Sequence, residues 1–156
     1  MSESRPIDDD APHLLIVDDD RRIRELLQKF LSGKGFRVTV AADAAEARRK
    51  LEGLDFDLII LDVMMPGENG IALTSSLKAV RDIPIILLTA LSEAESRVSG
   101  LEAGAEDYLA KPFDPRELVL RINNILKRSA SQAKPKFDQV IFGPYNFSLV
   151  KRELRK

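Results

Sequence analysis

The residues best suited to chemistry in this sequence are acids that close runs of aliphatic residues. The run Leu58–Leu61 ends abruptly on Asp62, and the first run of the chain, Leu14–Val17, ends on the acidic stretch Asp18–Asp20. Short, uninterrupted aliphatic runs are typical of strands buried on both faces of a parallel sheet. Ligands and reacting groups collect just outside the carboxyl ends of such strands, so we expect these acids to meet there.

A hydroxyl and an amine occupy the ends of two later runs. The run Pro84–Leu88 closes on Thr89, and the short run Asp107–Ala110 is followed by Lys111. In a parallel sheet, both side chains would lie at the same rim as the acids.

The three carboxylates of Asp18, Asp19 and Asp62 would repel one another and raise one another's pKa values. A divalent cation would remove that conflict, and Mg²⁺ prefers oxygen ligands and commonly works with phosphate groups. With Mg²⁺ and the amine of Lys111, the formal charges would sum to zero. We therefore expect Mg²⁺ as cofactor, bound by the three carboxylates and the main-chain carbonyl of Met64.

Such a pocket suits transfer of a phosphoryl group onto a carboxylate, because this chemistry depends chiefly on positioning and on positive charge. Asp62 is the expected nucleophile and phosphorylation site, since Asp carboxylates form aspartyl phosphates. Lys111 would contact one phosphoryl oxygen, and Thr89 would donate a hydrogen bond to another.

The elements that must position these residues follow a regular alternation. Strand and helix patterns alternate five times over residues 14–128, which predicts an α/β fold with a parallel sheet and helices on both faces. Helix starts are marked by capping boxes at Asp43–Glu46 and Ser92–Glu95, and by Asp114-Pro115. Asp20 is expected to cap a helix rather than to bind metal. The helix opened by Ser92 has a thin apolar face.

Composition narrows the possible classes of protein. The chain has 156 residues, 44% of them hydrophobic, with no Cys and a formal net charge of -1. Disulfides, thiolate metal sites and Cys nucleophiles are thereby excluded, and the charge favours no polyanionic partner. No apolar run approaches the roughly 20 residues that span a bilayer, and the N-terminus has no signal-peptide core. A cytoplasmic location is expected, and His13, the single histidine, is expected to be a surface residue ahead of the first strand.

The alternating pattern occupies only part of the chain. Residues 1–12 are polar and acidic and are expected to be disordered, whereas residues 13–128 form the main domain. Residues 129–136 are small and polar and are expected to form a linker. Residues 137–156 have a hairpin-like β pattern but are too few to bury a core alone.

Five motifs, in the right order, resemble the receiver domain of bacterial two-component response regulators. They are Asp18-Asp19 as the acidic pair, Asp62 as phosphoacceptor, Thr89-Ala90 as the switch hydroxyl with its small neighbour, Tyr108 as the switch aromatic, and Lys111-Pro112 as the lysine with its usual cis peptide bond. The resemblance implies a flavodoxin-like (βα)5 fold with a parallel sheet in the order 2-1-3-4-5. It also implies a phosphoacceptor signalling protein rather than an enzyme, with a sensor histidine kinase as phosphodonor.

Further motifs resemble the OmpR/PhoB group of transcription factors. They lie at residues 64–67, 100–108 and 111–113. This resemblance implies a homodimer through the fourth helix, fifth strand and fifth helix, with ion pairs between Arg97 and Glu117 and between Asp107 and Arg121. Residues 142–155 resemble the opening strands of that group's winged-helix DNA-binding domain. DNA would then be bound only through an effector domain that is largely missing from this chain.

Three other interpretations fit parts of the pattern. A phosphatase of the haloacid-dehalogenase type also forms an aspartyl phosphate, but it needs a second Asp two residues after the nucleophile, where this chain has Met64. A flavin-binding module would need a phosphate loop rich in Thr, Ser and Gly after the first strand, and none is present. A single-domain receiver that only docks on partners is the third, and a natural chain ending at Lys156 would favour it.

Overall fold

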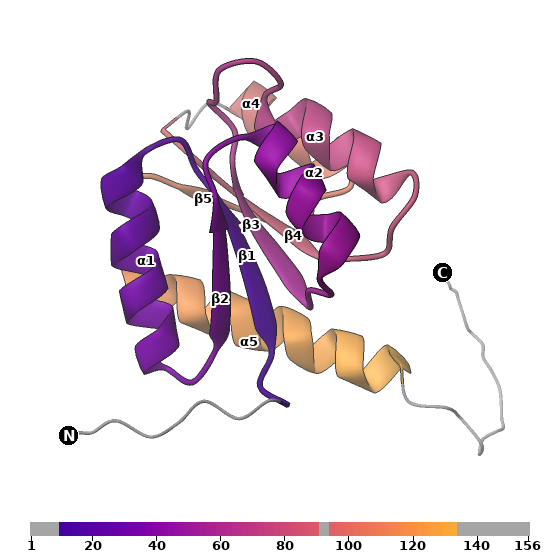
Figure 1. Ribbon diagram of the computed structural model, residues 1–156. Coiled ribbons are helices and arrows are strands. Elements are labelled where there is room, and N and C mark those ends of the chain that lie inside the picture. The colour runs from indigo at the N-terminus through magenta and orange to yellow at the C-terminus, as the bar shows by residue number, and fades with distance from the viewer. Residues whose placement is uncertain (1–9, 91–93, 134–156) are drawn as a thin grey trace, which may run out of the picture. The chain divides into compact units, whose positions relative to one another are not determined.

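The computed structural model describes residues 10–90 and 94–133 (Figure 1). Ser92 and the expected effector segment 137–156 lie outside these residues. Five strands and five helices alternate along the described chain: β1 (His13–Val17), α1 (Arg21–Gly33), β2 (Arg37–Ala41), α2 (Ala44–Gly53), β3 (Leu58–Asp62), α3 (Gly70–Lys78), β4 (Ile85–Thr89), α4 (Ala94–Glu102), β5 (Asp107–Ala110) and α5 (Pro115–Ala133).

The strands form one parallel sheet in the order β2-β1-β3-β4-β5. The predicted α/β, flavodoxin-like fold and its strand order are thus confirmed. Every residue of β3 and β4 is buried, which explains why these strands read as unbroken aliphatic runs rather than as alternating patterns.

Helices cover both faces of this sheet. In Figure 1, α1 and the part of α5 up to Ile125 lie on one face, while α2, α3 and α4 lie on the other. Because side chains of a strand point alternately to opposite faces, Leu15 and Val17 of β1 join the core cluster beneath α2 and α3. Leu14 and Ile16, which alternate with them, are equally buried. The sheet therefore lies between two apolar layers.

Side-chain caps fix where the helices start. The side chain of Asp20 accepts a hydrogen bond from Arg22 N at 2.9 Å, so its predicted role as N-cap of α1 is confirmed. Asp43 caps α2 by accepting from Glu46 N at 2.8 Å, and the Glu46 carboxylate in turn accepts from Ala42 N. These caps satisfy N–H groups that have no partner inside a helix.

At both ends of the described chain, the structure differs from the one predicted from the sequence. α5 continues to Ala133, so residues 129–133, expected within a linker, are helical. At the other end, Arg37 donates hydrogen bonds to the carbonyls of Ala11 and Pro12, both at 2.9 Å, which ties this part of the expected N-terminal segment to β2. The domain boundaries themselves stay predictions.

His13 requires a correction, because it is neither ahead of the first strand nor a plain surface residue. It begins β1 and is half-buried, with its ring 4.4 Å from that of Phe56 and its Nε2 2.7 Å from Thr39 Oγ1. Burial, followed by the nearby charge of Arg37, lowers the pKa of His13. Phe56, near the start of the adjacent strand β3, provides the cover that the sequence pattern around His13 does not indicate.

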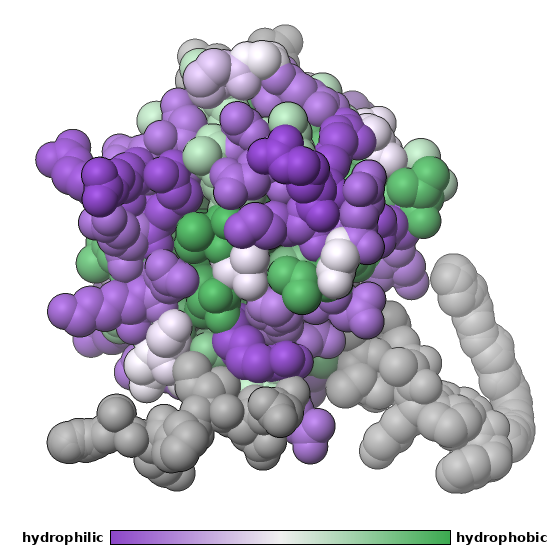
Figure 2. Space-filling model, in the orientation of Figure 1, coloured by the Kyte–Doolittle hydropathy of each residue, from purple (hydrophilic) through white to green (hydrophobic). Residues whose placement is uncertain are grey.

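The surface drawn in Figure 2 is largely hydrophilic, with small hydrophobic patches. Among the described residues, no helix combines the length and the apolar character that crossing a bilayer requires.

Candidate functional site

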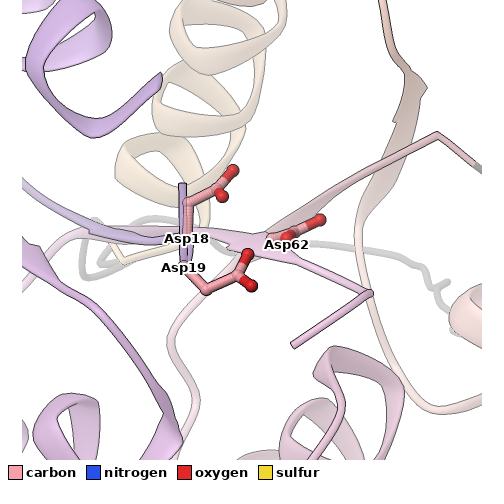
Figure 3. A group of neighbouring side chains, drawn as sticks. All are labelled: Asp18, Asp19 and Asp62. Atoms are coloured by element: carbon pink, nitrogen blue, oxygen red, sulfur yellow. The ribbon is translucent and has the colours of Figure 1, made fainter. Parts of the chain in front are cut away.

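Three carboxylates converge at the carboxyl edge of the sheet (Figure 3). Asp18 and Asp19 follow β1 directly, and Asp62 is the last residue of β3. β1 and β3 are neighbours, with Val17 in register with Leu61, so the residues that follow them emerge side by side. One carboxylate oxygen from each of the three acids lies within 4.8 Å of the others.

The three acids differ in exposure. Asp18 and Asp62 are only 1% and 3% exposed, whereas Asp19 is open to solvent. Asp18 is held on several sides: its Oδ1 accepts from Asp20 N at 2.9 Å, and its carbonyl accepts from Arg24 Nη1 at 2.7 Å. The buried member of the acidic pair is therefore fixed before any ligand arrives.

A single amine reaches both buried acids. Lys111 Nζ lies 3.0 Å from Asp18 Oδ2 and 3.4 Å from Asp62 Oδ1. The backbone of Lys111 is anchored to β4, since its N–H donates to the carbonyl of Thr89 at 2.7 Å, and the Lys111-Pro112 peptide bond is cis. Thr89, at the end of β4, is fully buried. The amine and the hydroxyl thus come from neighbouring strand ends at the same edge.

The electrostatics of this cluster favour a bound cation. Burial, and then the charge of Asp18, raise the pKa of Asp62 to about 6, even though Lys111 opposes the shift. Burial lowers the pKa of Lys111, but its hydrogen bonds and charge interactions with Asp18 and Asp62 outweigh that effect and raise it. Three carboxylates against one amine leave a charge of about -2 when all are ionised. Hard oxygen donors with an excess of two negative charges fit Mg²⁺.

The segment between Asp62 and α3 turns sharply. Gly67 has φ +80° and follows Pro66, a pattern typical of a type II turn, which favours glycine at that position. Met64 lies two residues before Pro66; its side chain is exposed, and its N–H lies 3.4 Å from Asp62 Oδ1. The carbonyl expected to bind the metal is therefore on a short, tightly bent segment next to the predicted nucleophile.

Gly70, the first residue of α3, packs directly against the end of β3. A Cβ at this position would collide with the carbonyl oxygen of Asp62 and lie 2.8 Å from Val63 Cα. Since both neighbours are backbone, the strand end itself would have to move.

We expect Gly70→Ala to lower the free energy of unfolding by about 2–3 kcal/mol, the cost of overpacking a tight contact. Gly53→Ala is the matched control, because a Cβ there meets nothing within 4 Å and alanine favours a helix. Urea unfolding of both variants measures the difference. Equal stabilities for the two variants would contradict the inferred close approach.

The residues expected in the switch and the dimer face lie around α4, β5 and α5. Tyr108 packs against the core cluster, and Ala90 and Arg97 are exposed. Arg121 contacts Asp107 at 2.7 Å and Glu117 at 2.8 Å within the same chain. The ion pairs expected between two subunits stay predictions, and Arg121 already has partners in the single chain.

The structure brings together most of the site residues predicted from the sequence. It also shows two residues at the site that the sequence did not indicate. Asp18, Asp19, Asp62 and Lys111 form one cluster, as expected from their places at strand ends. Arg24 and Gly70 were not anticipated; the only available signal for Gly70 was a glycine at the start of a helix, where it is a poor helix former.

Comparisons with known proteins agree with this geometry. Residues 14–123 match the response regulator receiver domain. PetR of Rhodobacter capsulatus is 59% identical over 145 residues, covering 92% of this chain and 60% of PetR. The transcriptional regulatory protein CpxR of Escherichia coli is 49% identical over 116 residues, covering 74% of this chain and 50% of CpxR. The chain thus spans about half to three fifths of these relatives.

Solved receiver domains share the fold over most of their length. The receiver domain of the response regulator TorR is 40% identical, with a TM-score of 0.72 over 75% of this chain and 98% of TorR's. TrrA of Thermotoga maritima, solved in complex with Mg²⁺-BeF, is 36% identical, with a TM-score of 0.66 over 73% of this chain and 98% of TrrA's.

Proposed function

The chain belongs to the response regulator receiver family, and from this premise we propose that it accepts a phosphoryl group on Asp62 from a sensor histidine kinase. It is a signalling protein rather than a classical enzyme. The observation that carries the proposal is the contact of one amine, Lys111, with two nearly buried carboxylates, Asp18 and Asp62, at the carboxyl edge of the sheet.

In the proposed reaction, a carboxylate oxygen of Asp62 attacks the phosphorus of a phosphohistidine. A P–O bond forms, the P–N bond breaks, and the histidine leaves as neutral imidazole, keeping the proton that its other ring nitrogen carries. Lys111 neutralises one phosphoryl oxygen, and Thr89 donates a hydrogen bond to another. Asp18, Asp19, Asp62 and the carbonyl of Met64 would hold Mg²⁺, which supplies further positive charge to the phosphoryl oxygens when bound.

The phosphatase alternative has no support at the required position. Its acid/base Asp would stand where this chain has Met64, whose side chain is exposed and carries no carboxylate. Removal of the phosphoryl group would therefore depend on water and on partner proteins, not on a second Asp of this loop.

The proposed output is a homodimer that controls transcription. The relatives that this chain matches over part of their length include two transcriptional regulatory proteins, CpxR and ResD of Bacillus subtilis. Phosphorylation would draw Thr89 toward Asp62, past the small Ala90, and let Tyr108 turn inward, so that α4 and β5 repack. Two receivers would then pair through α4, β5 and α5 and position a DNA-binding domain beginning within residues 137–156. The cytoplasm is the usual location of such regulators.

Exposed apolar side chains support this choice of face. Val98 and Leu101 of α4 are 51% and 43% exposed, and Leu120 of α5 is 63% exposed. Single exposed apolar residues are ordinary, but three on the two helices that flank β5 are a suitable centre for an interface. The ion pairs of Arg97 and Arg121 would select the register rather than supply affinity.

We expect the protein to change from monomer to dimer when Mg²⁺ and beryllofluoride are added. Leu101→Asp should weaken this dimer by about 10- to 100-fold, because a charge in an apolar contact costs about 1–3 kcal/mol. Light scattering measures the mass with and without the phosphoryl mimic.

Val80→Asp is the matched control, since Val80 is 77% exposed and lies after α3, away from the proposed face. It should dimerise like the wild type. A wild-type protein that stays monomeric, or equal losses in both variants, would contradict the proposed face.

A further inference from the structure

The segment after Asp62 is tied to a helix that carries none of the expected site residues. Arg48 of α2 donates from Nη2 to both carboxylate oxygens of Glu68, at 2.8 and 2.7 Å, and the same nitrogen lies 3.3 Å from Ser76 Oγ of α3. The contact spans 20 positions of the chain. It therefore joins α2, α3 and the segment between β3 and α3.

Glu68 lies in the segment that carries the proposed main-chain metal ligand. Residues 63–69 include Met64, whose carbonyl is the proposed main-chain metal ligand. Val63 and Met65 are buried at the start of the segment, and the side chain of Asn69 caps α3 at its end. Between these anchors lie Pro66 and the exposed Gly67. The hydrogen bonds from Arg48 to Glu68 restrain this exposed middle part.

We propose that Arg48 is a positioning residue for the metal site. By holding Glu68, it fixes the bent segment 63–69, and so places the carbonyl of Met64 where it can bind Mg²⁺ together with the three carboxylates. This inference rests on the proposed function, and it adds α2 to the elements that set the metal affinity.

Because the pair is partly exposed, a role in positioning the metal site can be distinguished from a role in global stability. The side chains of Arg48 and Glu68 are 40% and 32% exposed, and an ion pair of that kind contributes little to global stability. Loss of the pair should therefore leave the protein folded. Its effect should appear in the order of one segment and in whatever that segment binds.

The sign of the effect separates positioning from simple electrostatics. Arg48→Met removes a positive charge from the neighbourhood of an acidic site, and by charge alone this would tighten the binding of a divalent cation. If Arg48 acts by holding the segment in place, the same change weakens binding. The two explanations thus predict opposite shifts for one variant.

The test is a titration with Mg²⁺ alone, measured by calorimetry for the wild type and for Arg48→Met. We expect the dissociation constant to rise about 3- to 10-fold in the variant, with faster hydrogen exchange at the amides of residues 63–69. The charge-reversed double variant Arg48→Glu/Glu68→Arg restores the pair with the same net charge, and it should recover most of the lost affinity. Lys78→Met is the matched control: it removes one cation and breaks the 2.8 Å pair with Glu106, away from this segment.

The outcomes of this titration test the positioning role separately from the proposed function. Unchanged or tighter Mg²⁺ binding by Arg48→Met overturns the positioning role while leaving the proposed function intact. Equal weakening in Lys78→Met, or no recovery in the double variant, overturns it as well. A wild-type protein that binds no Mg²⁺ overturns the proposed metal site and this inference together, which distinguishes the two failures.

Discussion

Asp62→Asn is expected to abolish labelling of the protein by acetyl phosphate, with a loss of more than about 100-fold, as for removal of a catalytic nucleophile. The other acids of the site should not substitute for it. Asp18 is held by the N–H of Asp20 and by Lys111, and Asp19 lies on the exposed side of the cluster. Intact-protein mass spectrometry after incubation with acetyl phosphate and Mg²⁺ measures the label.

The same variant should be more stable than the wild type when no metal is present. Burial raises the pKa of Asp62 from 3.8 to about 6, so the folded state binds a proton more tightly than the unfolded state does. The ionised carboxylate therefore costs stability, and the cost grows between about pH 4 and pH 6. At pH 8, Asn should add about 2–3 kcal/mol to the free energy of unfolding, a gain that disappears below about pH 4.

Urea unfolding in the presence of a chelator measures this gain, and it also shows that the unlabelled variant is folded. Asp82→Asn is the matched control, because Asp82 is exposed and lies between α3 and β4. It should label like the wild type and change the free energy of unfolding by less than about 0.5 kcal/mol, as is usual for an exposed site. Labelling of folded Asp62→Asn at the wild-type rate would disprove the assignment of the nucleophile.

The sequence was sufficient to predict this site because the geometry of a parallel sheet does most of the positioning. Once Leu14–Val17 and Leu58–Leu61 are assigned as parallel strands, the acids that follow them must emerge at one edge, and they do. Lys111 follows from the same rule. The rule specifies which residues meet, and it needs no information about side-chain packing.

Features that depend on packing between distant segments could not be predicted in this way. Asp18 and Asp19 are identical neighbours in the sequence, yet Asp18 is buried in contact with Lys111 whereas Asp19 is exposed. The pair of Arg48 and Glu68 joins two polar residues 20 positions apart that no periodicity relates. The half-buried state of His13 depends on the aromatic ring of Phe56, which lies in the segment before β3.

Lys111→Met should lower the free energy of unfolding of the metal-free protein by about 2–4 kcal/mol at pH 8. Lys111 is the amine that contacts both Asp18 and Asp62, and without it the two nearly buried carboxylates face each other with no cation. Breaking a buried pair in this way is costly because the remaining charge stays desolvated. Urea unfolding at a series of pH values, with a chelator present, measures the loss.

The pH dependence of this loss shows whether repulsion between the two carboxylates causes it. The pKa of Lys111 is raised in the folded protein, so its contribution is present below its ordinary pKa of 10.5, provided that its partners are ionised. In the variant, Asp62 has lost the amine that opposes the rise of its pKa, so it takes up a proton at a higher pH than in the wild type. One of the two repelling charges then disappears, and the deficit of Lys111→Met should shrink as the pH falls. Added Mg²⁺ should also reduce the deficit at pH 8, because it replaces the missing positive charge.

Lys50→Met is the matched control, since the pair of Lys50 with Glu46 is 3.8 Å long and about one third exposed. Its effect should stay within about 0.5 kcal/mol at every pH. If the deficit of Lys111→Met were the same at pH 5 and pH 8, and unaffected by Mg²⁺, the loss would come from packing of the lysine side chain. The charge balance proposed to make Asp62 a phosphoacceptor would then need another explanation, because the same amine is proposed to neutralise the incoming phosphoryl group.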